Sequence, residues 1–196
     1  NELVGLVLDD GSRINLDVCL VGIGLAPNTQ IAEDADLRVD DGIVVDRLFR
    51  TDDPSIFAIG DVARFPDDDF GSLRLESIPN STDHARALAD SLTGNPKPYE
   101  AVPWFWSDQY DLKLQAVGMA VPGDTVVVRG DPDHDRAISV FYLRDGEVRA
   151  AEVVSNPRDF AMAKRLVSQR AKVDPSGLAD SAVSLKSLMA TASART

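Results

Sequence analysis

The segment Ser55-Ile56-Phe57-Ala58-Ile59-Gly60-Asp61 is an apolar run that ends in a glycine and an aspartate. A short apolar run bounded by turn residues predicts a buried strand. In α/β folds ligands bind beyond the carboxyl ends of strands, where Gly60 would let a ligand approach and Asp61 would accept hydrogen bonds from vicinal hydroxyls. An aspartate that only closes a turn or caps a helix gives the same pattern, so the residues alone leave both interpretations open.

Upstream of this segment, two alternating apolar runs flank Asp10-Gly11 and predict a β-hairpin. The second run continues through residues 18–24, which are apolar on both faces and predict a buried strand. Gly22 and Gly24 begin like a dinucleotide-binding fingerprint. Pro27 replaces the third glycine and no helical pattern follows, so we exclude a phosphate-binding loop here.

Downstream of the segment, Asn80 or Ser81 can cap a helix that ends near residue 92. His84 lies on this helix and is predicted as a surface residue paired with the neighbouring aspartate, rather than as a base. The proline-rich residues 95–103 follow and predict a linker with a domain boundary.

Alternating apolar side chains predict further strands at residues 42–45, 112–117, 125–128, 137–143 and 148–154. Asp145-Gly146, between the last two, is a tight hairpin turn. Asn156 then caps a helix, and a final helix covers about residues 182–192. A meander followed by two helices predicts an α+β domain. The aspartate-rich residues 66–69 and 131–135 predict solvated loops.

Four aromatic residues fall within seven positions of a chain that is only 6% aromatic: Trp104, Phe105, Trp106 and Tyr110. Such a group can pack into the core from a strand. It can also cover a planar cofactor or form the centre of an interface. The local sequence alone leaves these possibilities open.

The composition excludes several classes of function. The chain has 196 residues and a net charge of −12, which argues against nonspecific nucleic-acid binding. No apolar run reaches the length that a membrane span needs, so we expect no membrane partner. Residues 1–69 carry a net charge of −11, whereas the last 39 residues carry +4. That contrast serves solubility, or it marks a basic tail that touches an acidic partner.

Cysteine and histidine are scarce, which excludes other kinds of chemistry. Cys19 is the only cysteine and there are two histidines, so we expect no disulfide, no dithiol redox pair and no metal site. This usage fits a reducing compartment, and we expect a cytoplasmic location. The sequence contains no Gly-x-Ser-x-Gly or Walker motif, and it assigns no catalytic residue.

Three segments together resemble one family: Ile56-Phe57-Ala58-Ile59-Gly60-Asp61-Val62-Ala63, Arg74-Leu75-Glu76-Ser77-Ile78-Pro79-Asn80 and Pro103-Trp104-Phe105-Trp106-Ser107-Asp108-Gln109-Tyr110. Their order and spacing are similar to the C-terminal half of the FAD-dependent ferredoxin reductases, in the pyridine nucleotide-disulfide oxidoreductase superfamily. That family includes putidaredoxin reductase, rubredoxin reductase and the reductases of aromatic-ring dioxygenases, with apoptosis-inducing factor as a more distant relative. The third segment is far more specific to the family than the Gly-Asp pair.

The resemblance implies an α/β and α+β architecture in three parts. Residues 1–24 would end the NAD(P)-binding domain, and residues 25–98 would form the C-terminal part of a Rossmann-like FAD-binding domain. Residues 99–196 would form a C-terminal reductase domain, an antiparallel sheet plus two helices that carries the partner interface. The family's glycine fingerprints for FAD and NAD lie upstream of these segments. We therefore expect that an upstream half is missing and that the chain alone is inactive.

The resemblance also implies cofactor-binding residues. Asp61, preceded by Gly60, would bind the ribityl hydroxyls of FAD. Ile78 would contact the flavin through its backbone, just before a helix whose N-terminus favours negative charge on the reduced ring. Trp106 would lie beside the isoalloxazine, between the flavin and a partner protein.

Arg86 and Lys186 match positions where the family docks its partner, whereas Gln115 stands where putidaredoxin reductase has a lysine. The implied activity passes electrons from NAD(P)H through tightly bound FAD to a small iron–sulfur ferredoxin or to rubredoxin. Through that partner they reach a cytochrome P450 or a ring-hydroxylating dioxygenase. A truncated, enzymatically silent interaction module and an NADH oxidoreductase similar to apoptosis-inducing factor are the alternatives.

Overall fold

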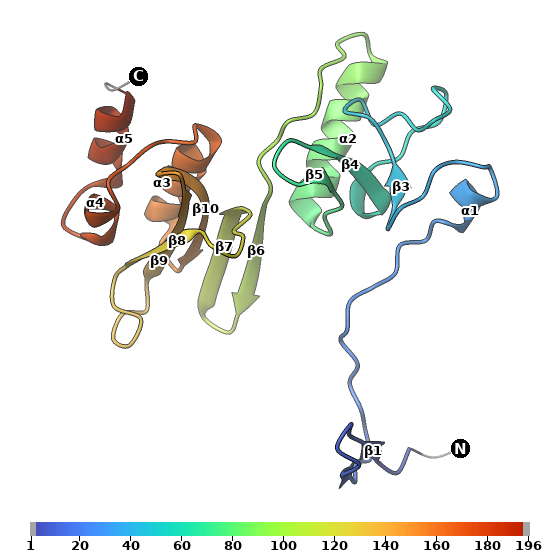
Figure 1. Ribbon diagram of the computed structural model, residues 1–196, viewed down its shortest axis with the longest axis horizontal. Helices are drawn as coiled ribbons and strands as arrows, with labels where there is room; N and C mark the ends of the chain where they lie inside the picture. Colours follow the sequence, from blue (N-terminus) through green and yellow to red (C-terminus); the bar gives the residue numbers. More distant parts are fainter. Residues whose placement is uncertain (1–2, 194–196) are drawn as a thin grey trace.

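The computed structural model describes residues 3–193, without the side chains of residues 191–193. Three parts follow one another along the chain (Figure 1). A small hairpin stands apart at the end of an extended segment, a middle part contains the long helix α2 (Ile78–Leu92), and a five-stranded sheet with helices completes the chain.

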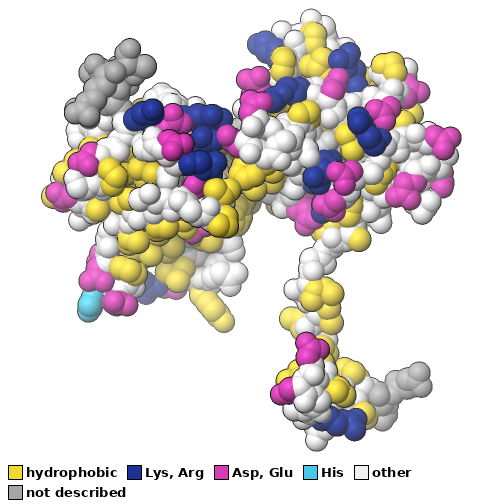
Figure 2. All heavy atoms as spheres, viewed as in Figure 1, with side chains coloured by type: hydrophobic (Ala, Val, Ile, Leu, Met, Phe, Trp, Pro, Cys, Tyr) yellow, Lys and Arg dark blue, Asp and Glu magenta, His cyan; other side chains and the backbone are white. Residues whose placement is uncertain are grey.

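The N-terminal hairpin pairs β1 (Leu6–Val7) with β2 (Arg13–Ile14) in antiparallel register. The predicted hairpin is therefore confirmed, with strands much shorter than the sequence pattern. The predicted buried strand over residues 18–24 is wrong, because these residues form no strand and their side chains face outward. Leu20 is 96% exposed and Ile23 is 90% exposed. Nothing in the described chain covers this apolar stretch, which Figure 2 shows as yellow side chains along the extended segment.

The middle part contains a three-stranded sheet in the order β3-β4-β5. The strand β3 (Ile43–Val44) runs parallel to β4 (Ala63–Asp67), and β4 is antiparallel to β5 (Gly71–Leu73). The strand predicted at residues 42–45 is confirmed. The solvated loop predicted at residues 66–69 is confirmed only in part, because Pro66 and Asp67 end β4 whereas Asp68 and Asp69 lie in the exposed turn that leads to β5. A short helix, α1 (Gln30–Glu33), precedes the sheet, and the 3-10 turn η1 (Gly60–Val62) precedes β4.

The apolar run that ends at Ile59 is not a strand, contrary to the sequence prediction. Only an isolated bridge joins Phe57 to Arg50, and Ile56 is exposed. Ala58 donates its N–H to the Phe49 carbonyl, so the run folds back on the residues just before it. Local pairing of this kind satisfies the backbone without placing the run inside a sheet.

Helix α2 begins three residues earlier than the sequence predicts. The Ser77 hydroxyl caps it by accepting the Asn80 N–H, and Pro79 occupies the first turn, where a missing N–H costs nothing. Asn80, predicted as a cap, is therefore buried inside the first turn, and Ile78 is the first helical residue.

The C-terminal part is an antiparallel sheet in the order β6-β7-β10-β9-β8. Its strands are β6 (Trp104–Gln109), β7 (Leu112–Gly118), β8 (Thr125–Arg129), β9 (Ile138–Arg144) and β10 (Glu147–Val154). Asp145 and Gly146 both have positive φ in the β9–β10 turn, as a two-residue hairpin turn needs. The predicted strands of this part and the antiparallel arrangement are confirmed.

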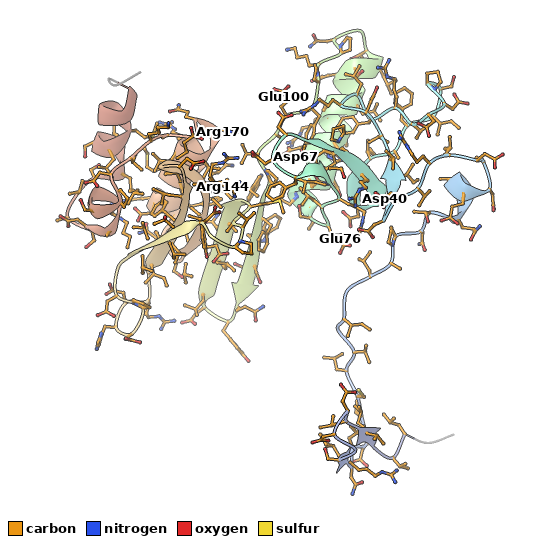
Figure 3. All side chains as sticks on the ribbon, viewed as in Figure 1. Asp40, Asp67, Glu76, Glu100, Arg144 and Arg170 are labelled. Carbon is orange, nitrogen blue, oxygen red and sulfur yellow. The ribbon has the colours of Figure 1, made fainter. Side chains whose placement is uncertain are left out.

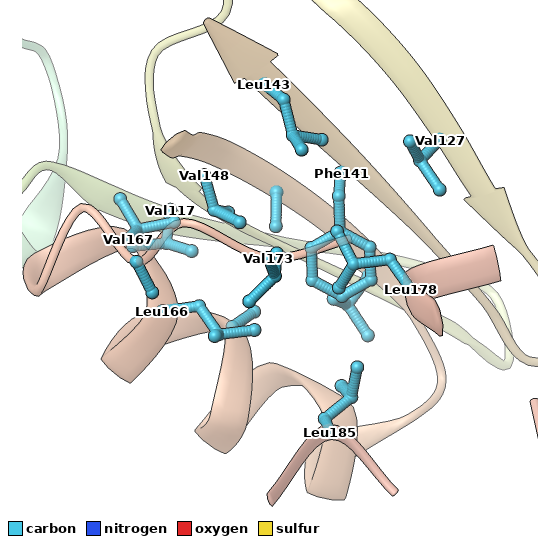
Figure 4. Close-up of a cluster of buried hydrophobic side chains, with 14 of the residues drawn as sticks. Val117, Val127, Phe141, Leu143, Val148, Leu166, Val167, Val173, Leu178 and Leu185 are labelled. Carbon is cyan, nitrogen blue, oxygen red and sulfur yellow. The ribbon is translucent and has the colours of Figure 1, made fainter. Parts of the chain in front are cut away.

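Three helices accompany this sheet, one more than predicted: α3 (Pro157–Ser168), α4 (Pro175–Ala179) and α5 (Leu185–Ser193). The Asn156 side chain caps α3, as predicted, by accepting the Asp159 N–H. Alternate side chains of the sheet pack with α3 around Phe141, Leu166 and Leu178, which are fully buried (Figure 4). None of the helices in residues 3–193 is long and apolar enough to span a bilayer.

Arg129 holds the segment that leads from α4 to α5 against the sheet. Its side chain is nearly buried, and its Nε donates to the Asp159 carboxylate at 3.0 Å. Its remaining nitrogens donate to four carbonyl oxygens after α3, those of Leu178, Asp180, Ser181 and Val183. One guanidinium therefore satisfies the irregular backbone between α4 and α5.

We predict that Arg129→Met lowers the free energy of unfolding by about 3–5 kcal/mol, because it removes the counter-charge of the Asp159 carboxylate and leaves several carbonyls without a donor. Urea denaturation followed by circular dichroism measures the change. Arg158→Met, at an exposed position on α3, is the matched control and should change stability by less than about 0.5 kcal/mol. Equal effects of the two substitutions would contradict the role given to Arg129.

Candidate functional site

Two hydrogen bonds tie the turn at Gly60-Asp61 to the first turns of α2. The Ser81 hydroxyl donates to the Asp61 carboxylate at 3.0 Å, and the Gly60 N–H donates to His84 Nδ1 at 3.1 Å. Gly60 has a φ of +73°, and a Cβ there would lie 3.2 Å from Ser81 Oγ. Glycine is therefore needed both for the backbone conformation and for the close approach of the turn to the helix.

The Asp61 carboxylate remains exposed beside the helix. Its main-chain carbonyl accepts a hydrogen bond from Arg74, whose side chain is nearly buried and also pairs with Glu76 and Asp41. Ser81 on one side and Arg74 on the other fix the direction of the turn. The free carboxylate oxygens are thus positioned to accept hydrogen bonds from a ligand.

The N-terminus of α2 adds three features to the same place. Helix N-termini carry a partial positive charge, which favours a negative group nearby. Ile78, the first helical residue, is 70% exposed and offers an apolar contact. Asn80 donates its side-chain amide to the Leu75 carbonyl, while its buried Oδ1 has no partner among the described residues.

His84 is fully buried, so its predicted place on the surface is wrong. The rings of Phe49, Phe65 and Tyr99 surround it, with centroids 4.6, 4.9 and 4.6 Å from the imidazole. Burial lowers the pKa of His84 from 6.5 to about 4, so the imidazole is neutral at pH 7. The neighbouring Asp83 pairs instead with Arg86, at 3.5 Å.

The aromatic segment divides between the two faces of the sheet. Trp104 packs against the core and against Phe160. The ring of Trp106 has its centroid 5.7 Å from that of Trp104, and its side chain remains 41% exposed. Phe105, between them on the strand, points to the opposite face and is exposed. Tyr110 projects from the β6–β7 turn. Core packing, one of the alternatives for this segment, therefore applies to Trp104, while Phe105, Trp106 and Tyr110 remain exposed.

The predicted docking residues are exposed and lie far apart along the fold. Arg86 is on α2, whereas Lys186 is on α5, which contacts α3 and α4 (Figure 1). Lys164, which the sequence analysis missed, lies on α3 between these places, with its Nζ 4.5 Å from the centre of the Trp104 ring. In the sequence, the one signal for Lys164 is its position four residues after Phe160, which places both side chains on one face of a helix.

A cavity of about 230 Å³ between the middle and C-terminal parts does not include Asp61. It lies between the β4–β5 hairpin and the C-terminal sheet, with Asp67 and Glu100 on one side and Arg144 and Arg170 on the other (Figure 3). Its arginines already have acidic partners: Arg144 pairs with Asp124, and Arg170 pairs with Asp69. Because the positive charges are neutralised within the protein, we assign the candidate site to the open surface around Asp61 instead.

The residues around Asp61 fit part of FAD, the cofactor that the resemblance implies. An exposed carboxylate suits ribityl hydroxyls, and a helix N-terminus beside exposed apolar groups suits a flat ring that can carry negative charge. The described residues contain no glycine-rich loop at a helix N-terminus for the pyrophosphate. The fit is therefore to the flavin end of the cofactor.

Two family models match the chain. Residues 1–87 match the model described as pyridine nucleotide-disulphide oxidoreductase, and residues 104–189 match the model described as reductase C-terminal. Putidaredoxin reductase from Pseudomonas putida is 40% identical over 98% of this chain and 46% of its own length.

Two solved structures share the fold. A ferredoxin reductase for the CYP199A2 system of Rhodopseudomonas palustris has a TM-score of 0.89 at 41% identity, over 96% of this chain and 46% of that one. Putidaredoxin reductase in its covalent complex with putidaredoxin has a TM-score of 0.88 at 40% identity, over 97% and 46%. The chain thus spans about half the length of the relatives it matches.

The buried His84 predicts a particular pH dependence of stability. The pKa of its imidazole is about 4 in the folded protein and 6.5 as an unperturbed histidine, so only the unfolded chain binds this proton between those values. Stability should therefore fall as the pH drops from 6.5 to 4, by up to about 3 kcal/mol from this residue. In His84→Gln this contribution is absent. Urea midpoints at pH 7.5 and 4.5 should differ less in the variant; equal differences would refute the prediction.

Proposed function

We propose that the chain is the C-terminal half of a flavoprotein of the ferredoxin reductase family that includes putidaredoxin reductase, which the two family models and the similar sequences and structures support. In this proposal the whole protein passes electrons from NAD(P)H through FAD to a small iron–sulfur ferredoxin or to rubredoxin, which serves an oxygenase. FAD, when bound, supplies the conversion of a two-electron hydride donor into single-electron transfers. The chain's own residues hold and orient that cofactor and receive the partner.

The observation that carries the proposal is the attachment of the Gly60-Asp61 turn to α2. It brings an exposed carboxylate beside a helix N-terminus, with Ile78 exposed at the same end. In the proposed protein Asp61 holds the ribityl hydroxyls and Gly60 allows the close approach. The backbone at Ile78 meets the flavin, where the helix dipole stabilises negative charge on the reduced ring. Trp106 covers the ring from the partner's side.

We further propose three domains with the boundaries given by the sequence. Residues 1–24 finish the NAD(P)-binding domain, residues 25–98 belong to the FAD-binding domain, and residues 99–196 form the reductase domain. The exposed apolar side chains of the N-terminal hairpin support the first boundary, since they need a covering that the described chain does not supply. Two separate clusters of buried residues, one around Phe49 and one around Phe141, support the second.

The partner surface is proposed to centre on Trp106, with cations at Arg86, Lys164 and Lys186. A ferredoxin of acidic surface would be repelled by the net charge of −12, so positive side chains on the docking side must guide its approach. A cytoplasmic location is proposed with this function, since NAD(P)H is the donor and the chain holds one free cysteine.

Asp61→Ala in the full-length flavoprotein should weaken FAD binding by about 10–100-fold, because hydrogen bonds to a charged acceptor contribute about 1.5–3 kcal/mol. Asp61→Asn keeps an acceptor oxygen and should cost less. Flavin fluorescence after dilution measures the dissociation constant. Asp90→Ala, the same change at an exposed position near the other end of α2, serves as the control. If both Asp61 variants bind FAD as tightly as the unmodified protein, Asp61 only closes a turn.

The double change Arg86→Glu, Lys186→Glu should slow ferredoxin reduction several-fold and alter its salt dependence, because exposed charges steer the encounter. Ferricyanide reduction by NADH should stay near normal, since hydride transfer does not use this surface. The charge-matched control is Arg38→Glu, Lys97→Glu, at two exposed positions elsewhere. An unchanged rate with ferredoxin would place the docking surface elsewhere, and an equal loss with both acceptors would indicate a damaged flavin site.

A further inference from the structure

His84 is a costly residue for the interior of the middle part. Its side chain is fully buried among three aromatic rings, and its Nε2 has no hydrogen-bond partner among the described residues. A buried polar group without a partner costs about 1–3 kcal/mol. An apolar residue would fill the same space without that cost. The one polar contact that the imidazole makes, with the Gly60 N–H, therefore needs an explanation beyond packing.

We propose that His84 is a positioning residue of the flavin site: its Nδ1 holds the Gly60 N–H and thereby fixes the turn that aims the Asp61 carboxylate. This inference rests on the proposed function, because it concerns the FAD-binding role of Asp61. Nothing in the family resemblance assigns a role to this position.

The helix geometry supports the proposal. Ser81 and His84 are three residues apart on α2 and therefore share one face. Ser81 holds the Asp61 side chain, and His84 holds the backbone of the residue before it. Two successive residues of the turn are thus attached to two successive positions on one helix face. Arg74 holds the Asp61 carbonyl from the other side, so the His84 bond is the attachment that fixes the backbone N–H of Gly60.

The aromatic surroundings fix the imidazole itself. Phe49, Phe65 and Tyr99 come from three different segments, and Tyr99 and Phe65 meet the imidazole edge-on, with interplanar angles of 90° and 85°. A ring held from three sides keeps the direction of its Nδ1 lone pair. Burial also keeps the imidazole neutral, so the lone pair stays available to accept a hydrogen bond at pH 7. The proton then resides on Nε2.

A matched pair of substitutions separates positioning from packing. His84→Leu fills the apolar surroundings and removes the acceptor, whereas His84→Gln retains an acceptor oxygen at comparable reach. A residue that only packs should tolerate leucine at least as well as glutamine. A residue that positions the turn should be rescued by glutamine alone.

The experiment uses the full-length flavoprotein and measures two quantities: the FAD dissociation constant by flavin fluorescence and the hydrogen exchange of the Gly60 amide. His84→Leu should raise the dissociation constant about fivefold, the equivalent of one neutral hydrogen bond, and should speed Gly60 exchange about tenfold. His84→Gln should stay within about twofold of the unmodified protein in both. Equal losses in the two variants, or no loss with leucine, would overturn the positioning role.

Nitrogen NMR of the imidazole in the unmodified protein gives a test that needs no substitution. The proposal requires a proton on Nε2 and none on Nδ1, and a proton on Nδ1 would overturn it even if His84→Leu failed to fold. If the proposed function itself is wrong, the result differs: the unmodified full-length protein then binds no FAD. Failure of the His84 role alone leaves FAD bound equally well by the unmodified protein and His84→Leu.

Discussion

The attachment of the Gly60-Asp61 turn to α2 is the constraint on which the candidate site depends. The Ser81 hydroxyl and the His84 imidazole each hold one residue of the turn, and both project from one face of the helix. The turn needs a positive φ that only glycine adopts easily, so it would not hold its shape without these attachments. Through them an exposed carboxylate and a helix N-terminus become one rigid feature.

Ion pairs join the middle part of the chain to the C-terminal part. Asp69, at the tip of the β4–β5 hairpin, pairs with both Arg149 of β10 and Arg170 after α3. Arg149 is nearly buried and also pairs with Glu147, so the acidic tip enters a network rather than a single exposed pair. This network lies beside the cavity that Arg144 and Arg170 line, and it fixes the hairpin relative to the sheet that carries Trp106. The position of that tryptophan relative to Asp61 therefore depends on charges distant from both.

The two ends of the chain are stabilised in different ways. At the C-terminal end a buried arginine, Arg129, satisfies the irregular backbone, and α3 covers one face of the sheet. At the N-terminal end the hairpin keeps only local hydrogen bonds, and its apolar side chains are exposed. An exposed apolar surface of that kind marks a place for a further protein surface. The proposed NAD(P)-binding domain would supply it.

The sequence by itself determined the C-terminal sheet, the cap at Asn156, the hairpin turn at Asp145-Gly146 and the family resemblance. Alternation with period two and turn chemistry are local properties, and in this sheet the local preferences agree with the final structure. Only the tertiary structure decided that His84 is buried, that Trp104 rather than Phe105 meets the core, and that the run before Gly60 is not a strand. These outcomes depend on residues distant in sequence: Phe49, Phe65 and Tyr99 enclose the imidazole, and Phe57 pairs with Arg50 instead of a neighbouring strand. The sequence around His84 and the apolar run before Gly60 do not show whether distant residues will pack against them, because burial is a property of the folded chain.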